Sequence, residues 1–233
     1  MPLPVLEAPT YNLVVPSTKK KLKYRPFLVK EEKILMIAQE SQSENQVISA
    51  VKNIISSCTF EKIDVNNIPM YDIEYIFLKI RSKSVGEVVD FQLKCSKAEC
   101  GHSNKIELNL GDVEVQYPKK KIDSNIKLNG TIGISLKPIN LADVSKSKGK
   151  DAITEMLTAS IDTIYDSDNV YKASDSTKKE METFVDSLSH KHLEKIQEFV
   201  VNQPTLKHNI EYTCEKCGHE NSYELSGLQS FFT

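Results

Sequence analysis

The sequence lacks the features that would assign it to a membrane, nucleic-acid or enzyme class. No apolar run approaches the roughly 20 residues that a membrane-spanning helix needs. Basic and acidic residues nearly cancel, at 30 against 32, so the net charge of -2 gives no general attraction to nucleic acid or to an anionic membrane. It contains no glycine-rich phosphate loop, G-x-S-x-G turn or H-E-x-x-H motif. We therefore expect no enzymatic activity, no small-molecule substrate and no membrane partner.

The N-terminal stretch MPLPVLEAPTYNL has neither a charged segment nor a long apolar core, so no signal peptide is predicted. We expect synthesis in a cytoplasm that keeps thiols reduced. Under those conditions, five cysteines in 233 residues indicate metal ligands before disulfides.

Two stretches far apart in the sequence share one pattern around paired cysteines. VDFQLKCSKAECGHSNKIELNL contains Cys95 and Cys100, and HNIEYTCEKCGHENSYELSGL contains Cys214 and Cys217. Each has an alternating strand, two cysteines, Gly-His, a polar turn with Asn and a second strand. The glycine after the second cysteine suits a turn with positive φ. The repeat predicts two β-hairpins, each with two thiolates at its tip.

Two such tips brought together supply four thiolates, which is a complete tetrahedral shell for zinc. We predict a split zinc ribbon that holds one structural Zn²⁺. The ligands would be Cys95, Cys100, Cys214 and Cys217. Four sulfurs leave no open position of the kind that a catalytic zinc keeps for water.

Three alternatives to this zinc site stay open. The cysteines could form disulfides, although nothing suggests an oxidising compartment. Cys214 and Cys217 could be a redox C-x-x-C motif, although no βαβ pattern surrounds them. His102 or His219 could replace one cysteine as a ligand.

The remaining elements come in runs of strands and runs of helices, an order that predicts an α+β fold with a helical core and β-hairpins. Strands outside the cysteine hairpins are expected at 11–15, 22–29 and 132–136. Helices are expected at 30–41, 47–58, 70–82, 152–165, 177–188 and 189–201. Residues 166–176 read as a polar loop.

Apolar spacing also predicts which helix faces are buried. In the first helix we expect Ile34, Ile37 and Ala38 to face inward. Cys58, the fifth cysteine, lies on the apolar face of the second helix and reads as a small core residue. Thr177 and Glu180 fit a capping box at the start of a later helix.

The charged stretch SKSKGKD, residues 145–151, is the expected boundary between two parts. Residues 1–146 would hold the N-terminal β-hairpin, helices, the first cysteine hairpin and the following strand. Residues 147–233 would hold a helical segment and the second cysteine hairpin. Because the predicted zinc joins both parts, we expect one compact unit.

Lysines gather at the first hairpin (Lys19, Lys20, Lys21 and Lys23) and at 119–121. Lysines near turns are usually solvated, so together with the near-zero net charge they do not favour nucleic-acid binding. They nevertheless define an alternative function, a zinc-ribbon adaptor that binds nucleic acid or the host transcription or replication machinery.

Three segments resemble the baseplate hub proteins of T4-like contractile-tailed phages: KKLKYRPFLVKEEKILMIA, RSKSVGEVVDFQLKC and FVVNQPTLKHNIEYTCEKCGHENSYELSGLQSFF. The resemblance runs from about Tyr11 to Phe232 and brings no reactive role to any residue. It implies a structural or assembly protein of the baseplate hub that binds other tail proteins. Such a protein would work in the host cytoplasm during assembly or in the virion tail. The basic hairpin and the Phe231–Phe232 tail are the expected contacts.

Overall fold

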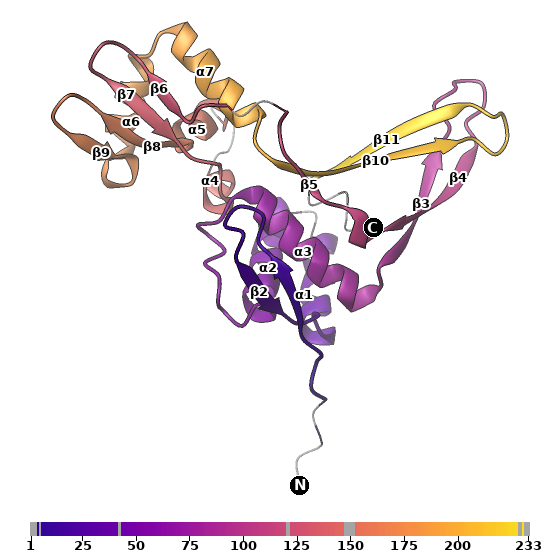
Figure 1. Ribbon diagram of the computed structural model, residues 1–233. Coiled ribbons are helices and arrows are strands. Elements are labelled where there is room, and N and C mark those ends of the chain that lie inside the picture. The colour runs from indigo at the N-terminus through magenta and orange to yellow at the C-terminus, as the bar shows by residue number, and fades with distance from the viewer. Residues whose placement is uncertain are drawn as a thin grey trace. The chain divides into compact units, whose positions relative to one another are not determined.

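The computed structural model describes residues 4, 6–41, 43–119, 122–146, 152–227 and 230 (Figure 1). It confirms a mixed helix-and-sheet fold. The chain forms two compact units. Unit 1 comprises Met1–Val65, Tyr71–Gln116 and Thr205–Thr233. Unit 2 comprises Asn66–Met70 and Tyr117–Pro204.

Unit 1 begins with an antiparallel hairpin followed by helices. The hairpin pairs β1 (Tyr11–Val14) with β2 (Lys21–Tyr24). The helices are α1 (Val29–Glu40), α2 (Glu44–Cys58) and α3 (Met70–Val85). The helix predicted over 70–82 is confirmed by α3, whose apolar stripe of Ile73, Ile76, Phe77 and Ile80 is fully buried. Cys58 is also fully buried, as predicted.

The second strand is shorter than predicted, because it ends at Tyr24 and not at residue 29. Pro26 has no amide to donate to a strand partner. The buried Glu31 carboxylate accepts the Leu28 amide at 2.8 Å and the Arg25 guanidinium at 2.8 Å. These bonds start helix α1 at Val29 and stop the strand before it.

The predicted inner face of α1 is wrong at two positions. Glu31, Leu35 and Ala38 form the buried stripe, whereas Ile34 is 45% and Ile37 65% exposed. Apolar residues occur on several sides of this helix, so its sequence pattern does not single out one face.

The two cysteine stretches form the predicted hairpins. The first pairs β3 (Val88–Lys94) with β4 (Ser103–Asn109) and is followed by η1 (Leu110–Asp112). The second pairs β10 (Thr205–Thr213) with β11 (Glu220–Ser226), and β5 (Val115–Gln116) extends it in the order β11-β10-β5. Both hairpins and α3 share one core. Its buried members are Tyr71, Leu78, Phe91, Leu93, Leu108, Leu110, Val113, Val115, Leu206, Ile210 and Leu225.

Unit 2 is a four-stranded antiparallel sheet with helices. The sheet has the order β6 (Asn125–Lys127), β7 (Gly133–Leu136), β8 (Ile161–Tyr165) and β9 (Val170–Lys172). The helices are α4 (Leu141–Lys146), α5 (Ala152–Ala159), η2 (Ala173–Asp175), α6 (Lys178–Asp186) and α7 (His190–Val201). Its buried core is Ile126, Ile134, Leu136, Ile161, Met181, Val185, Ile196 and Phe199. The capping box at Thr177 and Glu180 is confirmed.

The helix predicted over 152–165 is wrong in its second half. It ends at Ala159, and residues 161–165 are strand β8. Ile161 and Ile164 fit helical spacing, but a register shift between Ser135 and Leu136 of β7 lets both pair with that strand. Residues 166–176 are not wholly a loop, because they contain β9 and η2.

Some predictions fall on residues outside those described. These are 147–151 of the expected boundary, Lys120 and Lys121, and the tail residues Leu228, Phe231 and Phe232. The division of the sequence at that boundary stays a prediction.

Candidate metal centre

The tips of the two cysteine hairpins, β3–β4 and β10–β11, lie side by side (Figure 1), and four sulfur atoms come together there. All four sulfurs lie within 4.8 Å of one another. Two of the separations between the hairpins are 3.7 Å, from Cys95 to Cys217, and 3.8 Å, from Cys100 to Cys214. The cysteines predicted to meet therefore do so, and they come from positions more than a hundred residues apart.

The sulfur spacing fits a tetrahedral metal site. With metal–sulfur bonds of about 2.3 Å, the edge of a tetrahedron of sulfurs is about 3.8 Å. A disulfide would need about 2.05 Å, and all the cysteines are free. Among the described residues, this cluster consists of cysteines alone, without a histidine nitrogen. The geometry can hold a metal ion through four sulfurs.

Each hairpin tip is closed by the same backbone bond. The amide of the first cysteine donates to the carbonyl of the histidine that follows the second cysteine: Cys95 to His102 at 2.8 Å, and Cys214 to His219 at 2.8 Å. The intervening glycines have φ of 54° at Gly101 and 68° at Gly218, as predicted. Since a side chain is strained at such φ, glycine allows both turns.

Two buried asparagines connect the hairpins to each other. The Asn104 side-chain oxygen of β4 accepts the amide of Glu215, directly after Cys214, at 3.0 Å. The Asn221 side-chain oxygen of β11 accepts the amide of Ser96, directly after Cys95, at 2.8 Å. Each asparagine thus satisfies a backbone donor beside a cysteine of the opposite hairpin. The repeated C-G-H-x-N sequence contained this signal, but its cross-hairpin role was not predicted.

The side-chain amides of the same asparagines orient them. The Asn104 amide donates to the His102 carbonyl at 3.2 Å, and the Asn221 amide donates to the His219 carbonyl at 2.8 Å. The histidines therefore contribute backbone oxygens to both tips. The paired tips have the same hydrogen-bond pattern although their cysteine spacings differ.

Tyr212 of β10 adds a further bond between the hairpins. Its hydroxyl donates to the Lys94 carbonyl at 2.9 Å. Burial, together with the nearby Cys95 and Cys214, raises the pKa of Tyr212. The phenol consequently stays protonated and keeps this donor at neutral pH. Sequence reasoning treated Tyr212 only as part of the strand alternation.

The sulfurs differ in how readily they ionise. Burial acts to raise the pKa of Cys214, but the amides of Cys217 and Lys216 outweigh it and lower the pKa to about 6. At Cys217 the His219 amide acts to lower the pKa, yet burial and the neighbouring sulfurs raise it to about 11. The Cys214 thiolate forms easily, and its negative charge then opposes ionisation of Cys217. A bound cation relieves that repulsion and favours the thiolate form of every ligand.

Exposure of the sulfurs is graded across the site. Cys95 and Cys214 are buried, Cys100 is half-buried and Cys217 is exposed. The first cysteine of each hairpin thus lies on the side of the site that faces the protein core. The arrangement leaves one edge of the cluster open to solvent, from which an ion could enter.

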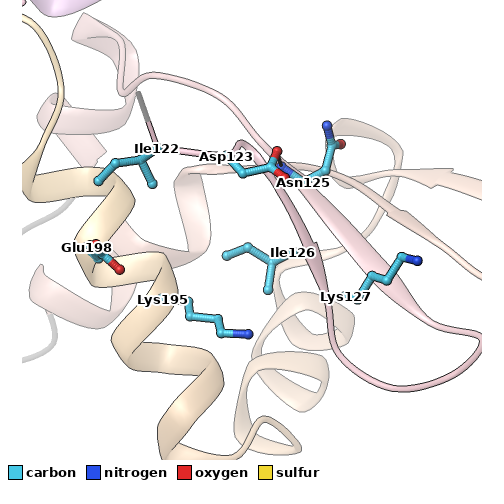
Figure 2. A pocket seen from close by; sticks show the side chains of 7 residues that line it. All are labelled: Ile122, Asp123, Asn125, Ile126, Lys127, Lys195 and Glu198. Carbon is cyan, nitrogen blue, oxygen red and sulfur yellow. Dashed lines mark hydrogen bonds between the residues drawn. The ribbon is translucent and has the colours of Figure 1, made fainter. Parts of the chain in front are cut away.

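Unit 2 contains a separate hollow of about 400 Å³. Figure 2 shows Ile122, Asp123 and strand β6 on one side, with Lys195 and Glu198 of helix α7 on the other. Its described lining contains no histidine, cysteine, serine or threonine. Among the described helices, none has the length and apolar content to cross a membrane.

The comparisons with known proteins agree with the sequence resemblance. A family model described as T4 bacteriophage base plate protein matches residues 8–233, nearly the whole chain. The chain belongs to this family of phage baseplate proteins. A search of curated proteins found no match, and neither did a search of solved structures.

Proposed function

We propose that this protein works at the central hub of a contractile phage tail baseplate, as a structural subunit or an assembly factor. The single observation that carries the proposal is the family match over residues 8–233. Its partners are then other tail proteins of the hub. Its place is the host cytoplasm during assembly, and the tail of the virion if it is retained there.

The proposed mode of action is contact between proteins, without a chemical reaction. Four cysteine sulfurs would fill the coordination shell of one metal ion and leave no position for a reacting water. The charged side chains that line the hollow beside α7 are Asp123 and Lys127 on one side and Lys195 and Glu198 of α7 on the other. Neither place has the nucleophile, base and orienting group that a catalytic site combines.

We further propose that the ion is zinc and that its role is structural. The ligands are Cys95, Cys100, Cys214 and Cys217, in the split zinc ribbon formed by the two hairpins. Tetrahedral four-sulfur sites suit zinc and also iron. Zinc is favoured because it binds thiolates and has no redox chemistry. A protein that acts only by contact does not need a redox-active metal.

Genetics tests the baseplate role. A phage lacking this gene should make heads normally but fail to complete baseplates, and protein supplied in the producing cell should restore tails. Mass spectrometry of purified particles then separates a retained subunit from an assembly factor that leaves. Complete, infectious tails in the mutant would overturn the proposal.

The second candidate function is a zinc-ribbon adaptor for nucleic acid, although the net charge of -2 does not favour it. Lys19, Lys20, Lys21 and Lys23 are all exposed at the β1–β2 hairpin. A heparin column distinguishes the two functions, because nucleic-acid binding should show a steep dependence on salt. A mutant phage arrested before any tail protein accumulates would also support the adaptor.

A further inference from the structure

The outer face of helix α1 carries exposed apolar side chains that nothing in the described part of the chain covers. Opposite the buried stripe, Val29 is 65%, Met36 53% and Ile37 65% exposed. The described residues include fifteen exposed large hydrophobic residues, and five of them lie between 28 and 37. This concentration distinguishes α1 from the scattered apolar residues of an ordinary surface.

A helix with apolar residues on opposite faces is typical of a helix covered on both. The unit 1 core covers one face of α1 through Leu35 and Ala38. The presence of apolar residues on both faces also explains why the inner face was predicted wrongly. Ile34 and Ile37 are suited to burial but are exposed in the single chain.

Charges on this face indicate what covers it. Lys33 and Glu40 are both exposed and lie seven residues apart, which is two helical turns along the same side. Met36 and Ile37 lie midway between them. If a second α1 lies antiparallel across this midpoint, Lys33 of each copy lies beside Glu40 of the other, so two ion pairs form. Met36 then packs against Ile37 of the other copy.

We propose that the outer face of α1 binds the same face of a second copy of this chain, antiparallel and about a two-fold axis between Met36 and Ile37. Such an isologous contact needs a surface complementary to itself. The order of basic, apolar and acidic residues meets that requirement, whereas an unrelated partner would not need it. The contact requires neither the metal nor any tail protein.

The contact should be weak and reversible. A helix of 12 residues is about 18 Å long. One face of that length provides less than the roughly 800 Å² per partner of a stable interface. We therefore expect a monomer–dimer equilibrium that depends on protein concentration.

Sedimentation velocity of the full metal-loaded chain over a concentration series tests the contact. Wild type should shift towards dimer as concentration rises, and Ile37→Asp should remain monomeric. Val201→Asp is the matched control, because Val201 is 73% exposed on α7 of unit 2. Circular dichroism should show that both variants keep their helices.

A charge exchange identifies the antiparallel pairing. Lys33→Glu alone and Glu40→Lys alone should each weaken the dimer about tenfold, because each places like charges together twice. The double variant Lys33→Glu with Glu40→Lys should restore wild-type affinity. A wild type that stays monomeric, a dimer indifferent to Ile37→Asp, or a double variant as weak as the singles would each overturn the proposal. Occupation of the α1 face by a different tail protein, with no dimer at any concentration, would do the same.

Discussion

Asn104 and Asn221 occupy equivalent positions in the two cysteine hairpins, and each accepts a backbone amide of the other hairpin. The amides belong to Glu215 and Ser96, each of which directly follows a cysteine of the cluster. These hydrogen bonds hold the hairpin tips in register without using the sulfurs. The asparagines thus position the ligands from outside the coordination shell.

We predict that Asn104→Ala and Asn221→Ala each weaken metal binding. Groups that orient metal ligands typically contribute 10–100-fold in affinity, and each substitution leaves one amide beside a ligand without its acceptor. Competition with a chromophoric chelator measures the change. Asn109→Ala is the control, since Asn109 accepts the Gly111 amide at the other end of β4. If the asparagine variants bind metal as tightly as this control, the positioning role is wrong.

Metal content is the second prediction. Purified protein should contain one equivalent of zinc by elemental analysis. Cys214→Ser should lose it, because three sulfurs cannot complete the four-thiolate shell. Cys58→Ala should keep it, because Cys58 is buried at the end of α2, outside the cluster. Full zinc in Cys214→Ser contradicts the ligand assignment, and bound iron in place of zinc contradicts the choice of metal.

The third prediction concerns metal removal. Structural zinc contributes on the order of 10 kcal/mol to the folding of small zinc-finger peptides. Here α3 has its own buried residues and unit 2 a separate core, so we expect partial unfolding only. Chelation should speed hydrogen exchange at the tips around Cys95–Asn104 and Cys214–Asn221. Exchange in α3 and unit 2 should change little. Unchanged exchange at the tips after verified metal loss would show that the ion is not structural.

The fourth prediction uses the ion pair between Arg25 and Glu31, whose side chains are 13% and 6% exposed. Arg25→Ala removes the closest cation from a buried carboxylate, which keeps the Leu28 amide and the exposed Lys30, and should cost about 3 kcal/mol at pH 7. Urea unfolding measures the loss. Lys105→Ala, which breaks the exposed pair with Asp90, should have little effect and serves as the control.

The same pair predicts how pH changes stability. Burial acts to raise the pKa of Glu31, but the bonds from Arg25 and the Leu28 amide outweigh it and lower the pKa. The stabilisation from Glu31 is therefore present above its ordinary pKa and is lost as pH falls through the lowered one. Loss of the Arg25 bond raises the pKa of Glu31 relative to wild type, so acidification from pH 7 to pH 4 should reduce the deficit against wild type. A constant or growing deficit would contradict this assignment.

Sequence reasoning succeeded where one short motif determines local geometry. The repeated Cys-Gly-His pattern predicted both hairpins, and the Thr177–Glu180 spacing predicted a helix start that the structure confirms. The meeting of the four sulfurs was also predicted, because two similar hairpins with two cysteines each suggest one four-cysteine site. The metal itself stays a prediction.

Sequence reasoning failed where distant packing decides between two patterns. Ile161 and Ile164 match helical spacing, and only pairing with β7 and β9 makes that segment a strand. Ile34 and Ile37 match a buried face, but the packing of α1 buries Glu31 and Leu35 beside Ala38, the one predicted position that is confirmed. The hydrogen bonds of Asn104 and Asn221 to the opposite hairpin depend on how the two hairpins pack together. The sequence of either hairpin alone does not indicate that packing.

Gln116 of β5 and Thr205 of β10 are direct partners across an antiparallel ladder. The chain leaves unit 1 at the first and returns at the second, after the main segment of unit 2. Closing a loop between fixed ends costs only slightly more entropy as the loop lengthens, and insertions are tolerated where the ends are adjacent. Residues 117–204 of unit 2 thus connect β5 to β10 of unit 1 in the way that the turn of a hairpin connects its two strands. Residues 117–204 could therefore be exchanged, lengthened or shortened during evolution while the cysteine hairpins of unit 1 stay unaltered.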